Sequence, residues 1–127
     1  MMQKEYKKFY EADLWQDAYG LQKEVFEQTQ TFPKHERYGL GSQLNDSSNS
    51  VCGNLAEEHG RFFYGDKIRI LYIVRGEMEE TQSHLIVAVS RGYIKKETSV
   101  SMIGRYEKLK MKINGRISDF RVKKERD

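Results

Sequence analysis

The spacing of the apolar residues constrains this chain more than any other feature of its sequence. They recur at steps of three and four, which places them on one face of a helix, whereas a half-buried strand alternates apolar and polar residues. Ahead of the only proline, Pro33, the residues at these steps are Leu14, Ala18, Leu21 and Val25. No segment alternates in the manner of a strand, and no Asn-Gly turn joins two such segments. The sequence therefore predicts an all-α fold.

Four stretches carry this helical pattern, and residues with known positional preferences mark their ends. Pro33 ends the first stretch, because the residue before a proline avoids the α region. Asp66 suits the N-cap or first turn of the third stretch, and Gly92 suits its C-cap. The predicted helices cover about residues 12–30, 35–62, 66–91 and 96–121, and the tail 122–127 is expected to fray. Joined by short connections, they predict one domain, 1–127, folded as an antiparallel up-and-down four-helix bundle.

Two features run against this pattern. Three glycines, Gly39, Gly41 and Gly53, lie inside the second predicted helix, where each costs up to about 1 kcal/mol relative to alanine. The β-branched run 68–74 could form a strand, but the helical spacing continues for several turns beyond it. As a helix, this third stretch is expected to bury Ile68, Leu71, Tyr72, Met78, Leu85, Ile86 and Val89.

Length and composition exclude several classes of protein. At 127 residues the chain is one domain by size, and its only cysteine, Cys52, allows no disulfide within the chain. No stretch approaches the roughly 18 apolar residues that a membrane span needs. Residues 1–8 lack the apolar segment of a secretory signal. We therefore expect a cytoplasmic protein with no membrane association.

Charge is distributed unevenly along the chain. Residues 1–90 contain 10 Lys and Arg against 14 Asp and Glu, whereas residues 91–127 contain 12 against 5. The formal net charge of +3 therefore combines an acidic body with a basic C-terminal part. A basic end on an acidic body indicates a polyanionic partner, although a lysine-rich solvated helix would show the same pattern.

The basic face of the fourth helix is the leading candidate for function. Side chains of this kind neutralise phosphates without reading bases, so they predict binding of structured RNA or DNA that is led by charge and shape. No RNA-recognition, zinc-finger or helix-turn-helix signature accompanies them. The candidate nucleic-acid-binding residues are Lys95, Lys96, Arg105, Lys108, Lys112, Arg116, Arg121, Lys123 and Lys124.

A second candidate is a set of polar residues on the second and third helices. Asn54, Glu57 and Arg61 lie at positions i, i+3 and i+7, and Glu57 can pair with Arg61 one turn away. If this face is buried, each charge needs a partner. We interpret the set as a structural network that fixes helix register or a subunit contact, with a ligand contact as the alternative. Its members are Gln43, Asn54, Glu57, Arg61 and Glu80.

Metal-dependent and nucleophilic catalysis find little support in the sequence. Di-iron bundles need histidines three residues after a glutamate, and none of His35, His59 and His84 has that spacing. Glu80 and His84 lie one turn apart, but this spacing more often gives a surface hydrogen bond. Cys52 has no activating neighbour and fits the role of a small buried apolar side chain. The sequence thus predicts no metal site, no cofactor and no catalytic residue.

Two other functions remain open. A protein-binding adaptor would dock a polymerase or another partner on the bundle surface, and neutralising the lysines of the fourth helix would leave its function intact. A metal-dependent enzyme or metal carrier would use Glu57, Glu80 and His84. Elemental analysis of the purified protein distinguishes this last possibility, because it requires a stoichiometric metal.

Several short motifs lie in an order and spacing that resemble one protein family. They begin with Phe9 and Leu14-Trp15-Gln16 and continue with Phe32-Pro33, Glu36-Arg37-Tyr38-Gly39-Leu40, Gln43-Leu44, Ser50-Val51, Asn54-Leu55-Ala56-Glu57 and Gly60-Arg61. In the same register follow Gly76, Met78, Glu80, Leu85, Ala88 and Gly92-Tyr93. Over about residues 9–94 the chain resembles the bacterial four-helix bundle family encoded in intervening sequences of 23S ribosomal RNA genes, also called S23 ribosomal protein.

The resemblance implies a four-helix bundle that assembles as a ring-like homopentamer. It also implies kinship with the accessory protein of diversity-generating retroelements, which binds nucleic acid through basic surfaces and partners a reverse transcriptase. Apolar side chains left exposed on the protomer, such as Trp15, Tyr19 or Tyr72, would supply the contacts between subunits. The expected partners are therefore other copies of the chain, RNA or DNA, and a protein partner.

The chain departs from the family pattern at three places on the second helix. Asn45-Asp46-Ser47-Ser48 stands where the family often carries basic and alanine residues, and Cys52-Gly53 stands where proline or alanine is common. Glu58 follows Glu57 where the family usually places glycine. Because the basic residues are missing from the second helix, the expected contact with nucleic acid moves to the fourth.

Overall fold

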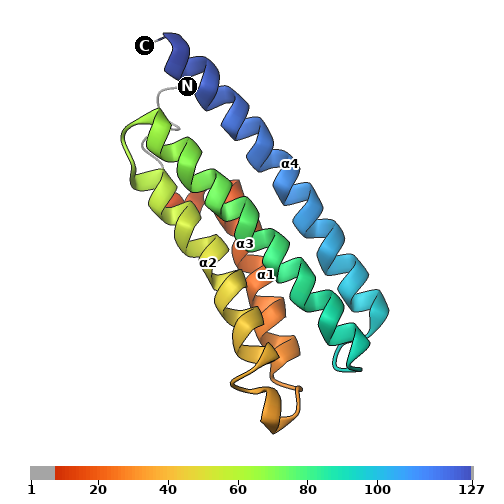
Figure 1. The fold of residues 1–127 in the computed structure, drawn as a ribbon. Coiled ribbons are helices and arrows are strands. Elements are labelled where there is room, and N and C mark those ends of the chain that lie inside the picture. The colour runs from red at the N-terminus through yellow and green to blue at the C-terminus, as the bar shows by residue number, and fades with distance from the viewer. Residues whose placement is uncertain (1–7, 127) are drawn as a thin grey trace.

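The computed structural model describes residues 8–126, which form four α-helices and two short 3-10 turns. The elements are η2 (Phe9–Glu11), α1 (Asp13–Thr29), η3 (Lys34–Glu36), α2 (Leu40–Gly60), α3 (Tyr64–Ser90) and α4 (Lys96–Arg126). Figure 1 shows the four helices running alongside one another. No strand occurs within residues 8–126, which confirms the all-α prediction. In the same range, no helix is long and apolar enough to cross a membrane.

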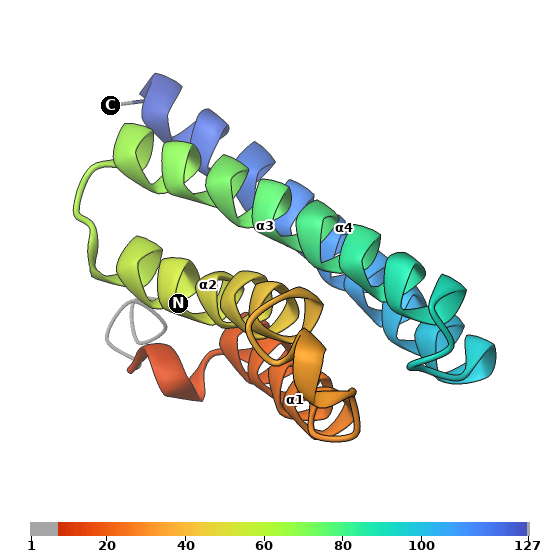
Figure 2. The same ribbon diagram turned by 60° about the horizontal axis from the view of Figure 1, so that its bottom comes forward.

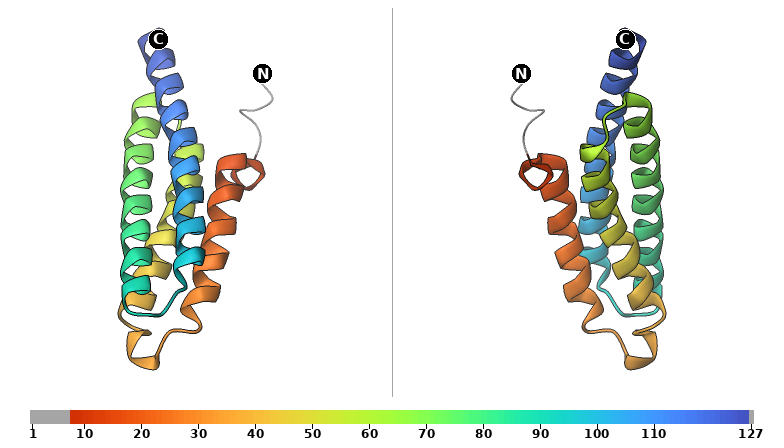
Figure 3. Two further views of the ribbon diagram at one scale, coloured as in Figure 1. Left: turned by 90° about the vertical axis from the view of Figure 1, so that its right-hand side faces the viewer. Right: turned by 90° about the vertical axis from the view of Figure 1, so that its left-hand side faces the viewer.

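The four helices form two pairs that face each other. In Figure 2, α3 and α4 lie in one layer, and α1 and α2 lie in the other. α2 packs closely against both α1 and α3, and α4 packs mainly against α3. The contact between α1 and α4 is the loosest of the neighbouring pairs, and Figure 3 shows α1 at the margin of the bundle. The bundle is therefore most open along its α1–α4 side.

Apolar side chains from all four helices meet in one core, which holds the bundle together. The positions predicted on the first helix, Ala18, Leu21 and Val25, are buried there. Tyr106 of α4 is the largest fully buried side chain, and burial raises the pKa of its hydroxyl. Removing a large apolar side chain from water contributes about 1.5–3 kcal/mol. The shared core is therefore the main source of the stability of the bundle.

Three of the positions predicted to be buried on α3, Leu71, Met78 and Leu85, lie in the core, but two others do not. Ile70 and Val74 are buried together with Met78, whereas Tyr72 and Ile86 are exposed. Tyr72 precedes Met78 by six residues, which turns it away from Met78 on a helix with 3.6 residues per turn. This part of α3 is apolar on nearly every side, so composition alone did not define the face that enters the core.

α2 begins at Leu40 rather than at the predicted residue 35, because a sharp turn precedes it. A Cβ at Gly39 would lie 2.8 Å from Oε1 of Glu36, and a Cβ at Gly41 would lie 3.0 Å from the main-chain oxygen of Glu36. Only glycine allows the chain to pass this close without displacing Glu36. These two glycines therefore shape the start of α2 and do not interrupt a longer helix.

Glu36 joins the connection between α1 and α2 to the connection between α3 and α4. Its buried carboxylate accepts hydrogen bonds from the amide of Leu40 at 3.2 Å, the hydroxyl of Tyr93 at 2.9 Å and the guanidinium of Arg91 at 2.9 Å. The bonds from Tyr93 and Leu40 lower the pKa of Glu36, and the contact with Glu36 raises the pKa of Tyr93. One carboxylate thus holds two connections together at the same end of the bundle.

Gly92 ends α3, as the sequence predicts, although the C-cap residue itself is Arg91 and Gly92 follows it. Gly92 has a φ of +78°, and its amide donates to the carbonyl of Val89 at 2.9 Å. The amide of Tyr93 donates to the carbonyl of Ala88, also at 2.9 Å. This is the Schellman motif, in which glycine adopts the left-handed conformation without steric cost. The motif ends α3 and places Tyr93 for its contact with Glu36.

α4 continues to Arg126, so residues 122–126 are helical where the sequence predicts a frayed tail. Asp127, the last residue of that predicted tail, lies outside the described residues. The added turns carry Lys123, Lys124 and Arg126, and cations favour the C-terminal end of a helix dipole. The Nζ atom of Lys124 also lies 3.5 Å from the place that a Cβ at Gly65 would take. The last turns of α4 thus lie alongside the first turn of α3 (Figure 1).

Candidate nucleic-acid interface

Arg105, in the first half of α4, is bound by an acidic residue of α1. Its two terminal nitrogens donate to the two carboxylate oxygens of Glu24, each at 2.5 Å. These hydrogen bonds lower the pKa of Glu24 and raise that of Arg105. Such two-pronged pairs fix the geometry of both partners. Arg105 therefore packs α4 against α1, and a phosphate would have to displace Glu24 to reach it.

Lys112 makes a second contact between α4 and α1. Its Nζ atom donates to Asp17 at 2.8 Å, and this bond raises the pKa of Lys112. Both side chains are exposed, so solvent screens the pair and its contribution to stability is small. Beside the pair, an open hollow of about 360 Å³ lies between α1 and α4, lined by Lys112 together with Arg105, Lys108 and Gly20.

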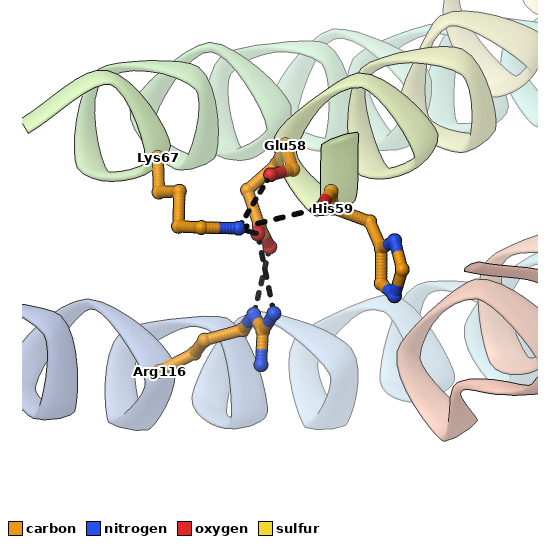
Figure 4. Close-up of polar contacts among 4 residues, drawn as sticks. All are labelled: Glu58, His59, Lys67 and Arg116. Carbon is orange, nitrogen blue, oxygen red and sulfur yellow. Dashed lines mark hydrogen bonds and ion pairs between the residues drawn. The ribbon is translucent and has the colours of Figure 1, made fainter. Parts of the chain in front are cut away.

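Arg116 belongs to a buried ion-pair cluster that joins three helices (Figure 4). The carboxylate of Glu58, on α2, is 2% exposed. Nε and Nη2 of Arg116 donate to its two oxygens at 2.7 and 3.2 Å. From α3, Nζ of Lys67 donates to Oε2 of Glu58 at 3.2 Å and to the main-chain oxygens of Glu58 and His59 at 2.9 and 3.4 Å. Two cations thus neutralise one buried acid, and His59 contributes only its main chain.

Three cationic side chains lie around the ring of Phe120, next to the Glu58 cluster. The charged groups of Arg116, Lys67 and Lys123 lie 4.7, 5.6 and 5.9 Å from its centroid. Cation–π contacts hold cations close to an aromatic face without neutralising them. Three cations therefore surround one ring, while Glu58 is the one acid that pairs with any of them in the described residues. This half of the bundle keeps an excess of positive charge.

The last turns of α4 carry four exposed cations, which we call the basic end: Arg121, Lys123, Lys124 and Arg126. Within residues 8–126, none of them forms an ion pair with an acid. Arg121 donates instead to the neutral hydroxyl of Tyr72 and lies 5.5 Å from the centroid of its ring. The basic end therefore presents its charge to solvent.

The other predicted contacts lie at the start and middle of α4. Lys95 and Lys96 flank the first turn, Lys108 lies on the α1 side, and all three are exposed. The nine predicted residues thus fall into two groups. Arg105, Lys112 and Arg116 bind acids of neighbouring helices, and the exposed remainder lies at the two ends of α4 except for Lys108 in its middle.

The sequence reasoning missed Lys110, which lies on the α3 side of α4. It forms ion pairs with Glu79 of α3 and, at 2.6 Å, with Glu107, and it donates to Gln82 at 3.0 Å. Burial alone would lower the pKa of Lys110, but the pairs with Glu107 and Glu79 outweigh burial and raise it. Gln82 also donates to Glu107 at 2.8 Å. The i,i+3 spacing of Glu107 and Lys110 is the one sequence signal for this network.

Within the predicted polar set, Glu57 and Arg61 do form the expected i,i+4 pair, at 2.5 Å, but both side chains lie in solvent. The buried acid of α2 is the next residue, Glu58. The core face of α2 passes through Val51 and Leu55, and a further step of three reaches Glu58 rather than Glu57. Because both residues are glutamates, their charge in the sequence could not show which of the two is buried.

The remaining members of the set make separate local contacts. Asn54 donates to the main-chain oxygen of Ser50 at 2.9 Å. Glu80 contacts His84 at 3.2 Å, which is the surface contact expected from their spacing. The side chain of Gln43 is exposed. The five residues therefore do not constitute one network, because within residues 8–126 their contacts lie on separate turns and helices.

The described residues include neither a clustered metal-binding set nor an activated thiol. In residues 8–126, no group of three or more His, Cys, Asp or Glu side chains is arranged to hold a metal ion. Cys52 is buried, and burial raises the pKa of its thiol to about 11. It therefore stays a neutral thiol near pH 7, which suits a packing role.

Comparison with known families agrees with this architecture. The profile of the family described as 23S rRNA-intervening sequence protein matches residues 10–115. The chain belongs to this family. The match covers α1, α2, α3 and most of α4, which confirms the family resemblance read from the motifs. It stops before the basic end of α4. No curated protein matches this family member.

Proposed function

We propose that this member of the 23S rRNA-intervening sequence protein family is a non-catalytic cytoplasmic protein that binds structured RNA or DNA by charge through α4. The observation that carries the proposal is the basic end, whose four cations have no acidic partner among residues 8–126. Phosphates of a folded nucleic acid would neutralise these cations and release counterions. Lys95, Lys96 and Lys108 would add contacts farther along α4.

The paired cations have a supporting role in this proposal. Arg105, Lys112 and Arg116 attach α4 to α1 and α2 and so hold the exposed cations in a fixed arrangement. Phosphate contacts of this type set the position of a nucleic acid and carry no sequence information. We therefore expect recognition of shape and charge rather than of a base sequence.

We further propose that the chain forms an antiparallel bundle and assembles as a ring-like homopentamer. Large apolar side chains on the outside of the protomer support assembly, because soluble monomers seldom expose many of them. They include Tyr19 and Phe26 on α1, Ile86 on α3, and Val100 and Met111 on α4. Cyclic symmetry would place five basic ends at one level of the ring, and several weak phosphate contacts would then act on one nucleic acid.

Fluorescence anisotropy tests the proposal with a labelled RNA hairpin and a DNA duplex of equal phosphate number. We expect binding at about 50 mM salt and a steep loss of affinity at about 200 mM, because phosphate-led binding depends on counterion release. Absence of binding at the lower salt concentration would overturn the proposal. A protein-binding adaptor would then be the better explanation.

A further inference from the structure

Two adjacent aromatic residues are exposed at the end of the bundle that carries the basic end. Phe62 and Phe63 lie in the short connection between α2 and α3, and they are 84% and 67% exposed. Their ring centroids are 5.1 Å apart and their planes lie at 90°, so each ring touches the other only edge to face. Large apolar rings in water are unfavourable unless a partner covers them.

The first turn of α3, which follows the two rings directly, lies against the last turns of α4. The next residue, Tyr64, places its ring centroid 5.5 Å from that of Phe120. Beyond it, Gly65 faces Nζ of Lys124, which would lie 3.5 Å from a Cβ at that position. In Figure 1 the α2–α3 connection and the last turns of α4 lie at the same end of the bundle, with the start of α3 between them. Exposed rings and exposed cations therefore share one end of the molecule.

We infer that Phe62 and Phe63 form a stacking platform for unpaired bases of a nucleic acid whose phosphates the basic end binds. The inference rests on the proposed function and identifies the part of the nucleic acid that this site takes. Aromatic side chains stack on every base, since each base has a π face, and cations beside them bind the flanking phosphates. The preferred ligand is thus a folded nucleic acid with a loop, bulge or single-stranded end, rather than a blunt duplex.

The surrounding charge favours this ligand over an apolar protein surface. Lys124 lies against Gly65, two residues after Phe63, and forms no ion pair with an acid within residues 8–126. Arg61, which precedes the rings, is instead paired with Glu57. The core of a protein–protein interface is depleted of charged residues, because burying cations without partners is costly. A nucleic acid supplies a phosphate for the cations and a base for the rings at once.

The test compares an RNA hairpin that has an unpaired loop with a blunt duplex of the same phosphate number. The variant Phe62→Ala/Phe63→Ala should bind the hairpin at least about tenfold more weakly and the duplex as the unchanged protein does. Phe62→Leu/Phe63→Leu keeps apolar side chains but removes the π faces, so it should behave like the alanine variant. Tyr38→Ala is the matched control, because Tyr38 is 90% exposed but precedes α2 at its other end.

A spectroscopic signal makes the test independent of affinity. With 2-aminopurine in the hairpin loop, stacking on an aromatic ring should quench its fluorescence when the unchanged protein binds. The quenching should disappear in both Phe62/Phe63 variants at saturating protein. Retained quenching in the alanine variant would overturn the inference.

The remaining outcomes separate the inference from the proposed function. Equal binding of hairpin and duplex, unaffected by either double variant, would overturn the stacking platform and leave charge-led binding intact. No binding of either RNA would overturn both. Affinity retained by the leucine variant would assign the rings to an apolar contact instead. If the alanine variant differs in molecular mass from the unchanged protein in the absence of RNA, the rings contact a second copy of the chain. If the alanine variant loses binding to phosphatidylserine vesicles, the rings contact a lipid surface.

Discussion

Arg116 donates two hydrogen bonds, of 2.7 and 3.2 Å, to the carboxylate of Glu58, which lies almost entirely out of solvent. The sequence offered Arg116 as a phosphate contact, but the structure uses its charge to neutralise a buried acid. One acid on α2 thus removes one cation of α4 from the set available to a ligand.

Loss of this pair should destabilise the protein. Arg116→Ala should lower the free energy of unfolding by about 3 kcal/mol, because Glu58 would stay buried with Lys67 as its one remaining partner. Urea denaturation followed by circular dichroism measures the change. Lys112→Ala is the matched control on the same helix, and it should have little effect, since its pair with Asp17 is exposed. Equal losses in the two variants would contradict the role assigned to Glu58.

Two glycines should respond to alanine in opposite directions. At Gly39 a Cβ would lie 2.8 Å from Oε1 of Glu36, which is bonded to the amide of Leu40, so Gly39→Ala should cost about 1–3 kcal/mol. At Gly115, inside α4, no atom lies within 4 Å of a Cβ, so Gly115→Ala should add about 0.5–1 kcal/mol. Thermal unfolding of both variants measures the difference. A stabilised Gly39→Ala protein would show that Glu36 can move aside at no cost.

The stability of the bundle should fall in acid. The hydroxyl of Tyr93 and the amide of Leu40 lower the pKa of Glu36, and the bond from Arg105 lowers the pKa of Glu24, both from an ordinary value of 4.5. A carboxyl group whose pKa falls on folding adds stability that is complete above its unfolded pKa and is lost as the pH drops through its folded pKa. Urea unfolding measured across acidic pH should therefore show a loss that begins near pH 4.5 and continues below it.

Variants at one contact isolate the part of this loss that comes from Glu36. Tyr93→Phe removes the donating hydroxyl, so the pKa of Glu36 should move back toward its ordinary value and the acid loss should become smaller. In a Glu36→Gln background, Tyr93→Phe should not change the pH dependence further. If Glu36→Gln alone keeps the pH profile of the unchanged protein, the account of this site is wrong.

Much of the fold could be predicted from the sequence, because its signals are local. The apolar periodicity ahead of Pro33 placed Ala18, Leu21 and Val25 in the core, and Gly92 marked the end of α3. The start of α2 could not be predicted in the same way. It depends on a carboxylate, Glu36, that bonds across to residues more than fifty positions away.

The candidate site was less predictable, since its charges are paired through tertiary contacts. Lys112 and Arg116 look alike in the sequence, yet one faces an exposed Asp17 and the other a buried Glu58. The sequence placed Phe62 at the end of the second predicted helix, 35–62, but α2 ends at Gly60 and Phe62 is exposed beyond it. The structure separates these cases by burial.

Assembly has a direct readout in solution. Five copies of a 15.0 kDa chain have a mass of about 75 kDa, and light scattering coupled to size exclusion distinguishes this from the monomer. Met111→Lys should shift the mass downward if the outer face of α4 lies between copies, because Met111 is 72% exposed in the protomer. A monomeric mass for the unchanged protein across micromolar concentrations would contradict the ring.

The central claim is that the basic end binds phosphate, and the salt dependence of RNA binding tests it most directly. Anisotropy titrations of a structured RNA over a range of salt concentrations give the slope of log affinity against log salt. Lys123→Glu/Lys124→Glu should weaken binding and reduce the magnitude of that slope by about 2, because each lysine neutralises roughly one phosphate. The control Lys34→Glu/Arg37→Glu changes the net charge equally but on the turn that precedes α2, and it should leave the slope unchanged. Identical affinities and slopes for both double variants would contradict the account.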